Sequence, residues 1–287
     1  MSMRTAFVET VAKLLDEDPR VVLLLGDISV HAFRDAKAKH PKRVINCGVS
    51  EQAMVSIAAG LSRAGMYPIV HTIAPFLVER ALEQLKVDFG YQGLAGCFVS
   101  VGASYDYAGM GCTHHCPGDV AAMQTIPGME IYAPGHADEV REWLPKIVDG
   151  ALGYVRLSDA QNPFPMMSPV VGMSNILSNE AILVVAAGPT VGLVPEDAHY
   201  FFMGRLDRVP ADMKRLRFRK VLVLEPFYVG TLTHLIAEAF PGALIRSVGV
   251  PRRFMDGYGT REEFDERCGL TAENVRRELT LLLETSY

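Results

Sequence analysis

The chain has 287 residues, 49% of them hydrophobic and 21% charged, which is typical of a globular protein large enough for two domains. Its formal net charge is −5, so charge gives no reason to expect binding to nucleic acid or to an anionic membrane. No apolar run approaches the roughly 18 residues of a membrane-spanning helix. Five cysteines, an odd number without a small disulfide framework, favour reduced thiols and a cytoplasmic location.

Apolar runs alternate with stretches of helical periodicity through the first 160 residues. Continuous apolar runs are typical of parallel strands that are buried on both faces. The alternation therefore predicts an α/β fold with a doubly wound, mostly parallel sheet. The expected strands are residues 21–25, 44–47, 67–71, 94–101 and 153–157, and the expected helices include 51–64, 76–89 and 137–148.

A second domain of similar class is expected at residues 178–287. A linker at 161–177 separates it from the first domain (1–160), because three prolines fall between Asn162 and Pro169. The second domain opens with an apolar strand at 181–186 and ends in a capped helix after Gly269.

The most informative stretch is RVINCGVSEQAMVSIAAGLSRA, residues 43–64. It opens with a short strand, Ser50 stands where a helix N-cap belongs, and Gly65 is placed to end the helix. Glu51 then lies in the first helical turn, at the carboxyl end of a strand, where ligands bind in open α/β sheets. Position alone favours a simpler role, because a carboxylate there commonly interacts only with the helix dipole.

This stretch resembles the central block of transketolases and their relatives, which include deoxyxylulose-phosphate synthases and the β subunits of 2-oxo acid dehydrogenases. The resemblance implies that Glu51 bonds N1′ of the thiamine diphosphate aminopyrimidine, and Val49 is expected to contact the cofactor as well. Asp27, at the carboxyl end of the strand 21–25, is a further candidate contact, although a turn cap is the commoner role for an aspartate there. Burial raises the pKa of a carboxyl by up to ~3–5 units. A helix N-terminus stabilises the anion by only ~0.3–1 kcal/mol, which lowers the pKa by less than about one unit. We therefore expect Glu51 to share a proton with the cofactor and to be catalytic.

An aromatic side chain stacks on the cofactor pyrimidine in this family. The family's usual Ser-Thr-Phe is replaced here by Thr72-Ile73-Ala74, and Phe76 is the nearest aromatic residue. Phe76 is either the stacking residue or an ordinary core residue. The helix predicted at 76–89 is expected to lie at a contact between two copies of this chain, with Gln84 and Asp88 on the contact side.

The loop after the fourth strand contains Cys-Thr-His-His-Cys at residues 112–116. A zinc site is disfavoured because the chain has no second ligand pair. The family instead carries Gly-x-Thr-His-Gln in this place, which resembles Gly111, Thr113 and His114. The resemblance makes His114 a second catalytic residue, able to move protons near the substrate oxygens. His115, which replaces the glutamine, is expected to contact substrate or cofactor.

Two departures from the family concern the substrate. Met110 stands where transketolases carry an aspartate that contacts a sugar hydroxyl, and Asp159 stands where sugar-phosphate enzymes carry an arginine. An aspartate repels a phosphate dianion that an arginine would bind through a bidentate fork. We therefore expect both residues to shape a substrate pocket for a ketose other than an ordinary sugar phosphate.

The family holds Mg²⁺ and the cofactor diphosphate through a Gly-Asp-Gly motif. The nearest candidate, Gly26-Asp27-Ile28-Ser29, lacks the second glycine, so we expect no metal ligands on this chain. The sequence resembles only the second and third domains of a three-domain enzyme. It is thus expected to be the C-terminal (β) subunit of a split, transketolase-like transferase, in an α2β2 assembly whose α subunit binds Mg²⁺.

Two alternatives remain open. The β subunit of a 2-oxo acid dehydrogenase shares the glutamate, but its loop usually carries Gln-His-Ser where this chain has Thr113-His114-His115. A non-catalytic homologue is the other alternative, because several sugar contacts are missing. The presence of both Glu51 and His114 argues against that second alternative.

Overall fold

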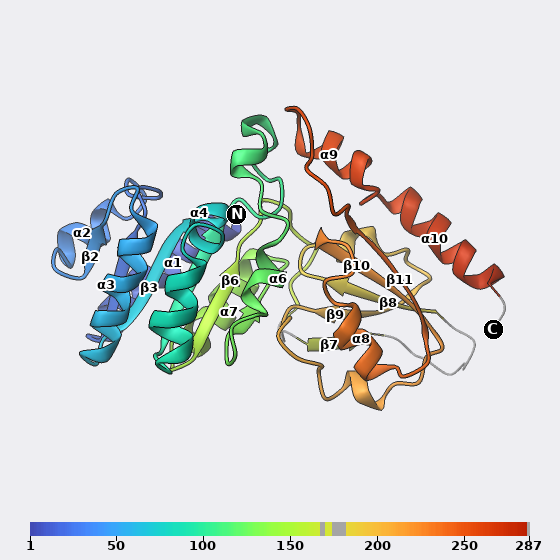
Figure 1. The fold of residues 1–287 in the computed structure, drawn as a ribbon, viewed down its shortest axis with the longest axis horizontal. Helices are drawn as coiled ribbons and strands as arrows, with labels where there is room; N and C mark the ends of the chain where they lie inside the picture. The colour runs from blue at the N-terminus through green and yellow to red at the C-terminus, as the bar shows by residue number, and fades with distance from the viewer. Residues whose placement is uncertain (167–169, 174–181, 286–287) are drawn as a thin grey trace.

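Two sheets, each covered by helices on both faces, organise the chain (Figure 1). The computed structural model describes residues 1–166, 170–173 and 182–285. The first sheet has the order β2-β1-β3-β4-β6-β5, and all its strand pairs are parallel. Its strands are β1 (Val21–Leu25), β2 (Val44–Asn46), β3 (Tyr67–Ile73), β4 (Gly96–Val101), β5 (Glu130–Tyr132) and β6 (Leu152–Arg156).

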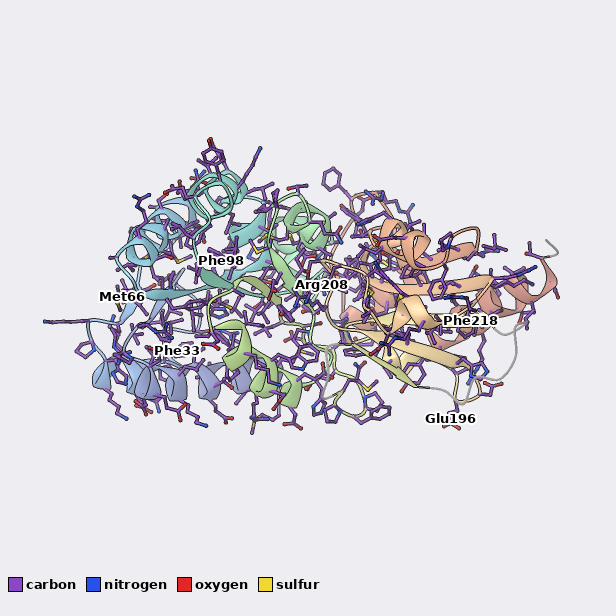
Figure 2. The ribbon with its side chains drawn as sticks, turned by 90° about the horizontal axis from the view of Figure 1, so that it is seen from below. Phe33, Met66, Phe98, Glu196, Arg208 and Phe218 are labelled. Atoms are coloured by element: carbon purple, nitrogen blue, oxygen red, sulfur yellow. The ribbon has the colours of Figure 1, made fainter. Side chains whose placement is uncertain are left out.

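Helices cover both faces of the first sheet. Figure 2 shows Phe98 and Phe33 on opposite sides of it, and each belongs to a different apolar cluster. The Phe33 side is covered by α1 (Met3–Glu17) and α7 (Ala137–Ile147), which pack against each other. The Phe98 side is covered by α3 (Glu51–Arg63), α4 (Ala74–Val78), the π-helix η1 (Leu85–Tyr91) and α6 (Asp119–Met123). The part of the chain that forms the first sheet also contains the short helices α2 (Arg34–Lys39) and α5 (Leu82–Gln84).

The second sheet has the order β11-β10-β8-β9-β7; among its described strands the β7–β9 pair is antiparallel and the other pairs are parallel. Its strands are β7 (Val170–Met173), β8 (Ile182–Ala187), β9 (His199–Met203), β10 (Lys220–Tyr228) and β11 (Leu244–Val250). One face packs on α8 (Thr233–Ala239), and the other packs on α9 (Arg261–Cys268) and α10 (Ala272–Glu284). The α/β prediction, with mostly parallel sheets flanked by helices, is confirmed.

Several local predictions were wrong. The stretch 76–89 is not one helix: α4 ends at Val78, and α5 and η1 follow after a break. The strand expected at 44–47 is an edge strand, so Asn46 is exposed rather than buried. Ser50 is at the N-cap of α3, but its hydroxyl makes no capping bond.

The region predicted as a linker, residues 161–177, contributes β7 to the second sheet; the parts at 167–169 and 174–177 lie outside the described residues. The helix after Gly269 is confirmed as α10, whose first turn is capped by the Thr271 hydroxyl. Within the described ranges, no helix has the length and apolar character needed to cross a bilayer.

A buried arginine connects the two sheets. The Arg156 guanidinium, at the end of β6, donates to the Asp119 carboxylate from Nε at 2.7 Å, and both side chains are almost fully buried. The same guanidinium donates through Nη2 to the Ser104 hydroxyl at 2.6 Å and to the Pro226 carbonyl, in β10, at 2.9 Å. Arg156 therefore connects the first sheet, the loop after β4 and the second sheet.

Candidate active site

The carboxyl ends of five neighbouring parallel strands meet at one edge of the first sheet. Asp27 follows β1, Glu51 follows β2, Phe76 follows β3, the loop containing His114 follows β4, and Asp159 follows β6. These strands are adjacent in the order β2-β1-β3-β4-β6, so their following segments lie along one edge of the sheet, the edge at which ligands bind in open α/β sheets.

Glu51 is an almost fully buried carboxylate at this edge. Its side chain is 1% exposed, at the first residue of α3. Oε2 accepts a bond from Arg80 Nη1 at 2.6 Å, while Oε1 is buried and has no partner in the described part of the chain. The burial of Glu51 is as predicted, but its pairing with the Arg80 cation was not predicted. The unpaired oxygen is an acceptor available to a ligand, because buried polar atoms are normally hydrogen-bonded.

Phe76 lies between the glutamate and the histidine. The Arg80 guanidinium is 4.2 Å from the centre of the Phe76 ring, and the His114 ring meets the same ring edge-on at 5.3 Å. Phe76 is partly buried, so part of its ring surface is accessible. The structure therefore brings Glu51, Phe76 and His114 into one continuous set of contacts.

His114 belongs to a loop whose two ends are tied together. Ser104 and Cys116 form an isolated antiparallel bridge, and the Cys116 amide donates to the Ser104 carbonyl at 2.7 Å. Within the loop, His114 Nδ1 is 3.0 Å from the Thr113 hydroxyl, and the imidazole ring lies 6.3 Å from that of Tyr107. The arrangement fixes the imidazole while leaving it accessible.

Three residues that were expected to contact substrate or cofactor, His115, Val49 and Met110, lie outside the Glu51–Phe76–His114 set. His115 turns inward: its ring is 7% exposed, packs against Phe264 of α9 at 5.2 Å, and lines a separate cavity of about 70 Å³. Burial lowers its pKa. Val49 is 66% exposed and Met110 is 56% exposed, so both side chains point mainly to solvent rather than into the Glu51–Phe76–His114 set.

The backbone of Asp159 is hydrogen-bonded to the Asp106 side chain. The Asp159 amide donates to the Asp106 carboxylate at 3.0 Å, and the Arg261 guanidinium and Ser158 hydroxyl also donate to that carboxylate. Burial raises the pKa of Asp106 to about 6, even with Arg261 beside it. The Asp159 carboxylate itself is exposed and forms no ion pair with a described residue. The Asp159 carboxylate is therefore accessible to a substrate.

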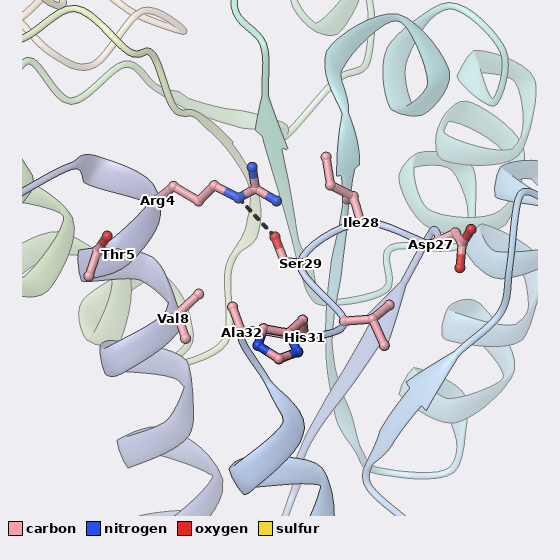
Figure 3. Close-up of a pocket in the computed structure, with 9 residues that line it drawn as sticks. Arg4, Thr5, Val8, Asp27, Ile28, Ser29, His31 and Ala32 are labelled. Carbon is pink, nitrogen blue, oxygen red and sulfur yellow. Dashed lines mark hydrogen bonds between the residues drawn. The ribbon is translucent and has the colours of Figure 1, made fainter.

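A pocket of about 630 Å³ opens beside the end of β1, between α1 and residues 27–32 (Figure 3). Arg4, in the first turn of α1, points into it and donates from Nε to the Ser29 hydroxyl at 3.1 Å. No carboxylate of the described chain pairs with this guanidinium. Asp27 lies at the far end of the same loop and bonds the Asn46 amide at 3.1 Å.

Ser29 is held in turn by a buried histidine. His71 Nδ1 lies 2.9 Å from the Val99 carbonyl, which can only accept, so Nδ1 carries the proton. Nε2 then accepts from the Ser29 hydroxyl at 2.9 Å. Burial lowers the pKa of His71 to about 4, so the imidazole is neutral near pH 7 and keeps this tautomer.

Sequence reasoning missed Arg80 and Arg4. Arg80 is four residues after Phe76, a spacing that allows two side chains to meet along a helical turn. Arg4 places a cation in the first turn of a helix, where the helix dipole disfavours it. Either signal could have marked these residues. No cluster of three or more metal-ligating side chains occurs in the described ranges, residues 112–116 included.

The family model for the transketolase pyrimidine-binding domain matches residues 1–158. This chain belongs to the transketolase family. An uncharacterized 33.6 kDa protein in the fasciation locus of Rhodococcoides fascians is 33% identical over 98% of this chain and 95% of its own length. The B subunit of apulose-4-phosphate transketolase from Phocaeicola vulgatus is 32% identical over 67% of this chain and 64% of its own length.

Some relatives are longer, and this chain matches only part of their length. 1-Deoxy-D-xylulose-5-phosphate synthase of Clavibacter sepedonicus is 29% identical over 97% of this chain, which spans only 46% of that enzyme. A solved structure described as a split gene transketolase, inactive beta4 tetramer, superposes with a TM-score of 0.81 at 24% identity, covering 99% of this chain and 98% of that one. The identification as a transketolase-like chain corresponding to the C-terminal part of such enzymes is confirmed.

Proposed function

We propose that this chain is the β subunit of a thiamine diphosphate-dependent transketolase-like transferase, which moves a two-carbon ketol unit from a ketose-type donor to an aldehyde acceptor. The observation that carries the proposal is the buried Glu51 carboxylate with one unpaired oxygen at the edge of the sheet. Family membership supports the use of thiamine diphosphate.

The residues present fit the aminopyrimidine of that cofactor. The orphaned Oε1 of Glu51 can accept a bond from a protonated ring nitrogen, and the partly buried Phe76 ring offers an aromatic surface beside it. Bound thiamine diphosphate would supply a carbanion at C2 of its thiazolium. Glu51 would hold the proton at N1′ on which formation of that carbanion depends.

His114 is the candidate acid–base group for the substrate. An imidazole can give and take a proton near neutral pH, and this one is accessible and held by Thr113 and Phe76. In this proposal it moves protons to and from the substrate oxygens as the carbon–carbon bond breaks and forms.

A partner chain would supply the diphosphate and Mg²⁺ sites. Asp27, which stands nearest to the position of the Gly-Asp-Gly aspartate, already bonds Asn46. The relatives described as the B subunit of a transketolase and as a split gene transketolase support an α subunit that carries these sites. We propose an α2β2 assembly with a β–β contact that includes Gln84 and Asp88.

The assembled enzyme provides the test. The chain would be mixed with an α-type subunit that carries a Gly-Asp-Gly motif, and two-carbon transfer from ketose donors would be followed with Mg²⁺ and cofactor present. Transfer by the mixture, with none by either chain alone, supports the proposal. Decarboxylation of a 2-oxo acid with transfer to a lipoyl group would indicate the dehydrogenase alternative, and absence of both would indicate a non-catalytic role.

The substrate is proposed to lack an ordinary terminal phosphate. Asp159 presents a carboxylate where the family has an arginine, and Met110 is exposed in the same loop as His114. An exposed aspartate in place of that arginine suits an unphosphorylated, amino or otherwise modified ketose better than a phosphate dianion.

The substrate proposal predicts slow turnover of ordinary sugar phosphates. With xylulose 5-phosphate and ribose 5-phosphate, kcat of the assembled wild type should fall well below the typical ~10 s⁻¹. Asp159→Arg should raise kcat/KM for these substrates by about 10-fold or more, and Asp159→Asn, which removes only the repulsion, by less. Wild-type turnover near ~10 s⁻¹ would lead us to withdraw the proposal.

A further inference from the structure

Arg80 contacts two members of the candidate site at once. Its Nη1 donates to Glu51 Oε2 at 2.6 Å, and its guanidinium carbon lies 4.2 Å from the centre of the Phe76 ring. The Arg80 side chain is 39% exposed, while that of Glu51 is 1% exposed. A partly exposed cation therefore reaches a fully buried carboxylate beside an aromatic ring.

The pairing has a physical reason. A lone carboxylate with 1% exposure is strongly disfavoured, and a paired cation offsets much of that cost. Arg80 satisfies only one carboxylate oxygen, because Oε1 has no partner among the described residues. The cation thus fixes the carboxyl group and still leaves one oxygen as a free acceptor.

We infer that Arg80 is a positioning residue that aligns the Glu51 carboxylate and the Phe76 ring for the incoming aminopyrimidine. The inference rests on the proposed function. Arginine suits this task because its planar guanidinium donates in a fixed geometry and stacks on an aromatic face at the same time. Lysine, a compact point charge, can pair with the carboxylate but cannot hold both groups in this way.

The first experiment needs no cofactor. Thermal melts of the isolated chain at pH 7 would compare wild type, Arg80→Ala, Glu51→Gln and the double variant. Arg80→Ala should lower the melting temperature by about 5 °C, because it leaves a buried charge unpaired. The loss should nearly disappear in the Glu51→Gln background, since the two residues form one coupled pair. Arg63→Ala is the matched control, because Arg63 is exposed and bonds Gln92 instead of Glu51.

The second experiment separates positioning from a merely structural ion pair. In the assembled enzyme with bound thiamine diphosphate, Arg80→Ala should slow proton–deuterium exchange at C2 by about 10–100-fold, the loss typical when a partner that orients a ligating group is removed. Added guanidinium ion should restore part of the rate. Arg80→Lys should stay about 10-fold below wild type although its charge is kept, and it replaces Arg80→Ala if that variant fails to fold.

The outcomes distinguish the two proposals. Slow exchange in Glu51→Gln together with wild-type exchange in Arg80→Ala or Arg80→Lys would overturn the role of Arg80 alone. Equal melting losses in the wild-type and Glu51→Gln backgrounds would also overturn it. Wild-type exchange in Glu51→Gln itself would instead overturn the proposed function.

Discussion

Substituting glutamine for Glu51 is expected to slow proton–deuterium exchange at C2 of bound thiamine diphosphate by at least ~10²–10⁴-fold in the assembled enzyme. That loss corresponds to roughly 3–5 kcal/mol at ~1.36 kcal/mol per decade. The amide keeps the shape of the carboxyl, but it cannot hold and return the proton at the ring nitrogen. Exchange followed by NMR after rapid acid quenching measures the effect.

A thermal melt of the same variant is the control. Glutamine is nearly isosteric, so packing around α3 should persist, and loss of the helix-dipole interaction should cost only ~0.3–1 kcal/mol. Arg80 would lose its partner, but its side chain is 39% exposed and can be hydrated. If the variant exchanged at the wild-type rate and only melted earlier, Glu51 would be a helix-terminal charge without a catalytic role.

Removing the carboxylate of Asp119 is expected to cause the largest loss of stability. Asp119 is fully buried and accepts bonds from Arg156 at 2.7 Å and from Tyr154 at 3.0 Å. Asp119→Ala would leave the buried guanidinium without its counter-charge, at a cost of about 3–5 kcal/mol. For a chain of this size, the melting temperature should fall by about 10 °C.

An exposed ion pair offers the matched control for this prediction. Asp212 lies 3.5 Å from Arg215, and both side chains are largely exposed. Asp212→Ala should change the free energy of unfolding by no more than about 1 kcal/mol. Equal effects of the two substitutions would show that the buried Arg156–Asp119 pair stabilises the chain no more than an exposed ion pair does.

The main architecture could be predicted because its signals are local. Buried apolar runs such as Val21–Leu25 mark parallel strands, and the junction before Glu51 places that residue at the carboxyl edge of the sheet. Phe76 and His114 followed from the family resemblance, and the structure brings them into ring contact. Their catalytic and binding roles are still predictions.

The missed features depend on contacts between residues that are distant in sequence. Arg80 reaches Glu51 across 29 positions, and Arg261 reaches Asp106 across 155. The spacing of Phe76 and Arg80 indicates only that these two side chains can meet, and it carries no information about a pair as distant in sequence as Arg80 and Glu51. The break after Val78 was missed for a related reason: the apolar residues on both sides of the break still follow helical spacing, with Leu77 and Leu85 buried on the same side.

Whether this chain supplies one half of a thiamine diphosphate site is tested most directly by isothermal titration calorimetry. Thiamine diphosphate with Mg²⁺ would be titrated into this chain, into the α-type partner, and into their mixture. Tight, Mg²⁺-dependent binding is expected only in the mixture, because the diphosphate and metal ligands are proposed to lie on the partner and the Glu51 oxygen on this chain. Strong Mg²⁺-dependent binding to this chain alone would contradict the proposal.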